Sequence, residues 1–215
     1  MKKYLITILL LIITCTLVFS ACTTSAAWQN QNSETKGSDV IVSASNGSEK
    51  YIVFAALNSA GNLIVRPAVG DPEATSTYAV VGYTGLVSEL VIPAQYAGKN
   101  VTKVLVAPAG NDYLLYRDVT ALGAPVSYTG DDARLQNNPV VTSIVFGTNV
   151  SFVGAGVCAG MTNLKKVSFA RASGVTLGTS AFEVCTSLNE VVFACASGSA
   201  TLNGNFSGLT PTYLS

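Results

Sequence analysis

Thiols are the side chains of this sequence best able to do chemistry, because it contains five cysteines and no histidine. Without an imidazole, the chain lacks the usual general base, the commonest nitrogen metal ligand and a charge switch near neutral pH. Three cysteines, Cys158, Cys185 and Cys195, lie beyond the first 22 residues. Cys158 and Cys185 fall in apolar columns of a repeat, which favours buried thiols. A Cys185–Cys195 disulfide that closes a short loop is the alternative.

No sequence motif of nucleophilic, phosphate or redox chemistry is present. The chain has no Gly-x-Ser-x-Gly elbow, no phosphate-binding glycine-rich loop and no Cys-x-x-Cys pair. Lys+Arg and Asp+Glu both total 12, so no basic field would attract nucleic acid. We therefore expect no catalysis, no cofactor, no metal site and no nucleic-acid partner. A hydrolase that uses a pair of carboxylates is a remote alternative.

The first 22 residues read as an export signal. Lys2 and Lys3 precede an apolar run over residues 4–19, and small residues then lead to Cys22. This segment resembles a bacterial lipoprotein signal, in which that cysteine receives the lipid. The resemblance implies a lipid on Cys22 and, because Thr23 is not acidic, a place in the outer membrane or at the cell surface. An ordinary cleaved signal is the alternative. A transmembrane anchor would need about 20 apolar residues, and this run is shorter.

The remaining chain divides into three parts by composition. Residues 23–39 are polar and without an apolar period, which predicts a flexible tether. Residues 40–85 hold β-branched and aromatic runs separated by Gly, Asn and Pro, which predicts a β cap. The predicted strands are Val40–Ser43, Tyr51–Leu57, Asn62–Val65 and Tyr78–Tyr83, with a hairpin turn over residues 59–62.

Residues 86–215 carry a repeat of 23–24 residues. Its clearest part is a run of Leu-x-x-Val-x-Phe type, in which three apolar residues recur in fixed columns. The three copies are Val141, Ile144 and Phe146; Leu164, Val167 and Phe169; and Leu188, Val191 and Phe193. Such a period predicts a solenoid of stacked coils with one parallel strand per coil. Residues 107–133 break the pattern and are interpreted as an insertion or as a protruding loop.

The repeat text resembles that of BspA-like bacterial surface leucine-rich repeat proteins. The best copy is Leu177-Gly178-Thr179-Ser180-Ala181-Phe182, followed by Cys185, Leu188, Val191 and Phe193. The resemblance implies a mainly β fold, a short leucine-rich-repeat solenoid with an N-terminal β cap. It also implies protein partners such as host matrix or cell-surface proteins, and adhesion as the function.

Within each strand, alternate side chains should face outward. The outward columns form the predicted binding face, and Lys166 and Glu190 should be neighbours across strands. Its residues are Ser143, Lys166 and Glu190 in one column and Val145, Ser168 and Val192 in the other. A different hypothesis places a glycan on tyrosines of the insertion, which are Tyr113, Tyr116 and Tyr128.

Overall fold

The computed structural model describes residues 33–36, 39–42, 46–65, 73–107, 113, 115–117 and 134–214. The chain divides into units of residues 1–31 and 32–215, and every described residue belongs to the second unit. The predicted signal, its lipid site Cys22 and Tyr128 lie outside the described residues. Within the described part, no helix is both long and apolar enough to cross a membrane.

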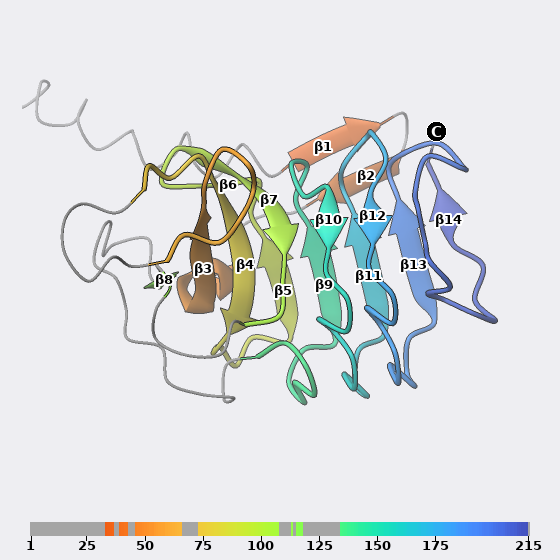
Figure 1. Cartoon of the computed structure of the whole chain (residues 1–215). Coiled ribbons are helices and arrows are strands. Elements are labelled where there is room, and N and C mark those ends of the chain that lie inside the picture. Colours follow the sequence, from red (N-terminus) through yellow and green to blue (C-terminus); the bar gives the residue numbers. More distant parts are fainter. Residues whose placement is uncertain are drawn as a thin grey trace, which may run out of the picture. The chain divides into compact units, whose positions relative to one another are not determined.

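The fold is a β-solenoid with almost no helix, as predicted. Five parallel strands stack side by side in one sheet, here called the repeat sheet (Figure 1). In spatial order they are β5 (Glu89–Ile92), β9 (Ser143–Phe146), β11 (Lys166–Phe169), β13 (Glu190–Phe193) and β14 (Thr212–Tyr213). Coils 1 to 4 are the turns of the chain that begin at β5, β9, β11 and β13.

Register in the repeat sheet follows the apolar columns of the sequence. Val167 pairs with Ile144 and Val191, and Phe169 pairs with Phe146 and Phe193. The three phenylalanine rings are buried and stack with centroids 4.5 Å apart at both steps. Identical rings in register are favoured because parallel strands repeat at about the thickness of stacked rings. The predicted common interior of the coils is therefore confirmed.

A second sheet, here called the cap sheet, closes the other side of the coils. Its strands, in spatial order, are β12 (Thr176–Leu177), β10 (Phe152–Val153), β7 (Lys99–Val104), β4 (Thr77–Tyr83), β3 (Ile52–Leu57) and β8 (Leu115–Arg117), and β6 (Gln95–Tyr96) pairs with β7. The members from the coils are β7 (Lys99–Val104), β10 (Phe152–Val153) and β12 (Thr176–Leu177), all parallel. Thr201 of coil 4 continues this ladder as a single bridge. The sequence predicted one strand per coil, so the strands that the coils contribute to the cap sheet were not predicted.

The N-terminal strands extend the cap sheet as a hairpin. β3 (Ile52–Leu57) and β4 (Thr77–Tyr83) are antiparallel, and β4 adds in parallel to β7. The turn predicted at 59–62 follows β3 and lets Leu57 bridge Leu63, but the strand predicted over Asn62–Val65 is present only as isolated bridges. β8 (Leu115–Arg117), from the predicted insertion, pairs with β3, so this part of the insertion packs back onto the cap.

The edge of the repeat sheet at β5 is covered by η3 (Ser48–Tyr51), a single 3-10 turn. The backbone N–H of Val91 donates to the Ser48 hydroxyl at 3.0 Å, and the Asn46 amide donates to the Glu89 carbonyl at 2.8 Å. The turn thus satisfies edge groups that would otherwise pair with another strand. Farther upstream, β1 (Ser33–Lys36) lies within the stretch predicted as a tether and pairs antiparallel with β2 (Asp39–Val42), which overlaps the predicted strand Val40–Ser43.

Candidate functional site

The predicted pair on the outward face of the repeat sheet is present. Lys166 and Glu190 are register partners on β11 and β13, and Lys166 Nζ lies 2.7 Å from a carboxylate oxygen of Glu190. Their side chains are 46% and 49% exposed, so water screens the pair. Ser143 continues this column on β9 and is half-buried.

The other outward column corrects the predicted binding face. Val145 and Ser168 are only 7% and 4% exposed, and Val192 is half-buried. The small Ser168 side chain lies between the two β-branched valines at the parallel-strand spacing, and these valines belong to an outward apolar cluster with Ala170 and Ala194. Val145 and Ser168 were predicted to be accessible, and that prediction is wrong.

The tyrosines proposed as a glycan platform do not act together in the described residues. Tyr116 packs toward the main core, with its ring centroid 5.7 Å from that of Tyr78 in an edge-to-face contact. Tyr113 packs against a separate cluster that includes Leu115, on the opposite face of the cap sheet. Two rings on opposite faces cannot stack against one sugar.

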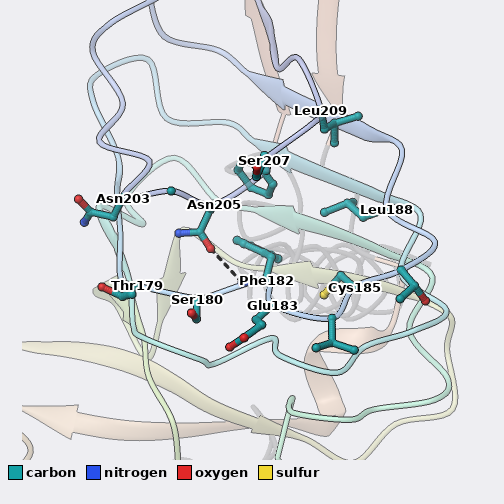
Figure 2. A pocket seen from close by; sticks show the side chains of 14 residues that line it. Thr179, Ser180, Phe182, Glu183, Cys185, Leu188, Asn203, Asn205, Ser207 and Leu209 are labelled. Carbon is teal, nitrogen blue, oxygen red and sulfur yellow. Dashed lines mark hydrogen bonds between the residues drawn. The ribbon is translucent and has the colours of Figure 1, made fainter.

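A groove opens instead along the turn side of coils 3 and 4 (Figure 2). Its volume is about 610 Å³, and it lies between residues 179–188 and residues 203–209. Apolar side chains of Phe182, Leu188, Phe206 and Leu209 line it together with hydroxyl and amide groups. Glu183 is the one charged residue among those lining the groove, and its side chain is exposed.

The turn side of coils 2 and 3 is joined by a ladder of backbone hydrogen bonds. The N–H groups of Gly156, Cys158 and Gly160 donate to the carbonyls of residues 179, 181 and 183 at 3.2, 2.8 and 2.8 Å. Both donors and acceptors are alternate residues, as in a parallel strand pair. Coil 2 therefore lies directly against coil 3.

Between coils 3 and 4 this ladder is interrupted, and two asparagine side chains take its place. Asn203 Nδ2 donates to the carbonyl of Leu177 at 2.7 Å. The N–H of Phe182 donates to Asn205 Oδ1 at 3.1 Å, while Asn205 Nδ2 donates to the carbonyls of Gly178 and Leu202. Within the described residues, no acceptor takes the N–H of Ser180 or Val184. Asn205 stands in the column that Val157 and Ala181 occupy in the earlier coils, where both are buried. Asn205 thus joins coil 4 to coil 3 through its side chain.

Val184 has an unusual backbone conformation at the edge of this groove. Its φ is 59°, in the left-handed region, which is strained for a β-branched residue. The same turn position holds Asn137, Gly160 and Gly208 in the other coils, residue types that adopt this region at lower cost. Val184 is also 60% exposed, so burial does not offset the strain.

None of the three cysteines of the repeats forms a disulfide. The competing Cys185–Cys195 disulfide is therefore not formed. Burial raises the pKa of Cys158, and burial also raises the pKa of Cys185 to about 11. The Cys185 thiol donates to the Cys158 carbonyl, with Sγ 3.1 Å from the oxygen. A protonated thiol is a poor nucleophile, so Cys185 contributes apolar surface to the groove rather than reactivity.

The described residues contain no group of three or more Cys, Asp or Glu side chains that could hold a metal ion. What the groove offers chemically is an apolar floor, neutral hydrogen-bonding groups and one carboxylate, an arrangement suited to binding. Sequence reasoning missed it, although Asn205 was visible at the position that holds Val157 and Ala181 in coils 2 and 3. Comparison of the chain with protein-family profiles, with curated proteins and with solved structures found no match.

Proposed function

We propose that this chain is an exported protein, anchored by a lipid on Cys22 in the bacterial cell envelope, that binds protein partners and catalyses no reaction. The export signal and its cysteine support the location. The absence of histidine from the whole sequence, together with the raised pKa of Cys158 and Cys185, supports a binding role over catalysis.

The groove between coils 3 and 4 is the observation that carries the binding role. A hollow of about 610 Å³ lined by apolar side chains, neutral polar groups and one carboxylate has the size and lining of a ligand site. The exposed, strained Val184 at its edge supports the same conclusion, because strain persists where a side chain has a role beyond stability.

The partner class rests on the resemblance of the repeat text to BspA-like leucine-rich repeat proteins. That resemblance favours host matrix or cell-surface proteins as partners and adhesion as the outcome. The Lys166–Glu190 pair on the repeat sheet would be a secondary contact, because its neighbours Val145 and Ser168 offer little accessible surface.

The anchor is tested by labelling cells with a radioactive fatty acid. The wild-type chain should take up label and partition with membranes, whereas Cys22→Ser should lose both. Label retained by the Cys22→Ser variant would contradict the anchor without affecting the binding role.

The binding role is tested with full-length protein on cells, screened against immobilised matrix proteins and a glycan array. Ser207→Trp places a large ring in the groove at an exposed position, and Ser197→Trp is a matched exposed control outside the groove. We expect Ser207→Trp to abolish binding and Ser197→Trp to preserve it. Binding lost only in a Lys166→Ala, Glu190→Ala double variant would return the site to the repeat sheet.

A further inference from the structure

Because the hydrogen-bond ladder is interrupted between coils 3 and 4, backbone N–H groups at alternate residues are left as donors at the groove. In the junction between coils 2 and 3, here called the closed junction, the N–H groups of Gly156, Cys158 and Gly160 donate to coil 3. The residues 24 positions later are Ser180, Phe182 and Val184, and Figure 2 shows Ser180 and Phe182 beside the groove. Of these three N–H groups, only that of Phe182 has an acceptor in the described structure, the Asn205 side chain.

The closed junction shows which groups accept hydrogen bonds from such a row of N–H donors. There the acceptors are the carbonyls of Thr179, Ala181 and Glu183, three alternate residues of one chain. Alternate carbonyls directed to one side are what an extended peptide presents to a neighbouring strand. A peptide in the groove would therefore continue the inter-coil contact that coils 2 and 3 already make.

The lining of the groove adds two further constraints on the ligand. Phe206 and Leu209 are half-buried and form an apolar floor for alternate side chains of the peptide. Glu183 contributes the only charge, and its carboxylate is exposed. A basic side chain on the peptide complements that charge, and an acidic one is disfavoured.

From these observations we infer that the groove between coils 3 and 4 binds an extended peptide segment carrying a basic residue. The carbonyls of the peptide accept hydrogen bonds from the N–H groups of Ser180 and Val184. Val184 also contacts the peptide with its side chain, which accounts for a valine where the other coils hold Asn or Gly. This inference rests on the proposed binding function and specifies its ligand; recognition by strand addition derives affinity from main-chain hydrogen bonds.

The test begins with a phage-displayed library of random heptapeptides selected on the full chain. Enriched peptides are synthesised and titrated into ¹⁵N-labelled protein. We expect them to be rich in Lys or Arg, to shift the Ser180 and Val184 amide signals and to slow hydrogen exchange at both positions. Ser207→Trp should abolish these changes, and Ser197→Trp should leave them intact.

Two milder variants keep the test independent of folding defects. Glu183→Gln should weaken binding of the basic peptides by about two- to fivefold, as for an exposed ion pair. Val184→Gly removes the strained side chain, so it should raise the melting temperature while it weakens peptide binding. A Val184→Gly variant that binds peptide as well as wild type would overturn the assigned contact.

The inference and the proposed function fail in different ways. If no peptide is enriched, or if enriched peptides leave the Ser180 and Val184 amides unchanged, the peptide inference is overturned. If oligosaccharides on a glycan array bind instead and Ser207→Trp abolishes that binding, the groove remains a binding site but its ligand is not a peptide. If neither matrix proteins, peptides nor glycans depend on Ser207, the proposed binding site fails as well.

Discussion

The junction between coils 2 and 3 and the junction between coils 3 and 4 are built from the same sequence columns but differ in closure. In the first, three backbone hydrogen bonds join the turn sides, and Val157 and Ala181 are buried. In the second, the side chains of Asn203 and Asn205 make the connection and a groove opens. The comparison teaches that a groove can open between two coils where asparagine side chains replace the backbone hydrogen bonds of the other junction. The repeat sheet and the cap sheet each stay paired across both junctions.

The largest expected effect distinguishes the interiors of the two junctions. Phe169→Ala removes a fully buried ring from the phenylalanine stack and should lower the free energy of unfolding by about 3–5 kcal/mol. Phe206→Ala removes a half-buried ring at the open junction and should cost clearly less. Urea denaturation of the full chain measures both. Equal losses would mean that the open junction is packed as tightly as the closed one.

Thiol reactivity tests the raised pKa of Cys185 and of Cys158, the two residues joined by the thiol–carbonyl hydrogen bond. The pKa of Cys185 rises from 9.0 to about 11, so at pH 8 its thiolate fraction should be about a hundredfold below that of an unperturbed thiol. Alkylation followed by mass spectrometry should find Cys185 slow and Cys158 slower still in the folded protein. Fast labelling of Cys185 at pH 8 would show that the thiol is more open to water than its contacts indicate.

The same shift gives stability a pH dependence. Because the pKa of Cys185 is raised on folding, its protonated form favours the folded state fully below pH 9. That contribution is lost as pH rises from 9 through about 11. Cys185→Ala should flatten the fall in melting temperature over that interval, and Ser173→Ala, at an exposed position, serves as the control.

Glycine substitutions test the spacing of the coils directly. A Cβ on Gly178 would lie 2.3 Å from the backbone nitrogen of Ala155, so Gly178→Ala should force coils 2 and 3 apart at a cost of about 1–3 kcal/mol. A Cβ on Gly204 meets nothing within 4 Å, so Gly204→Ala should cost only the strain of its positive φ, about 1 kcal/mol. Chemical denaturation ranks the two, and the reverse order would contradict the assigned closure.

The smallest effect concerns the outward pair. A double-mutant cycle with Lys166→Ala and Glu190→Ala should give a coupling of about 0.2–1 kcal/mol, because both side chains are about half exposed. The coupling should shrink in high salt. A coupling that exceeds this range and resists salt would indicate that the pair is shielded from water.

Much of the fold could be predicted because the core columns repeat in the sequence itself. The pairing of Phe146, Phe169 and Phe193 and the Lys166–Glu190 contact follow from the period and from strand alternation. The second strand of coils 2 and 3 was missed because β10 and β12 are two residues long, too short for alternation to appear.

The candidate site was less predictable because it depends on neighbours and on side-chain reach. Strand alternation places Ser168 on the outward face. Its exposure, however, is set by the valines on the neighbouring strands and not by its being a serine. The groove follows from the hydrogen bonds of Asn205 to the preceding coil. The change from Ala181 to Asn205 between coils 3 and 4 is visible in the sequence, but only the geometry reveals that the junction is open there.

Amide hydrogen exchange in the unliganded full chain tests the difference between the junctions most directly. The N–H groups of Gly156, Cys158 and Gly160 should be strongly protected, because each donates to coil 3. At the equivalent positions of coil 3, Phe182 should be protected, while Ser180 and Val184 should exchange near the rate of an unstructured chain. Ser180 and Val184 amides as protected as those of Gly156 and Gly160 would contradict an open junction.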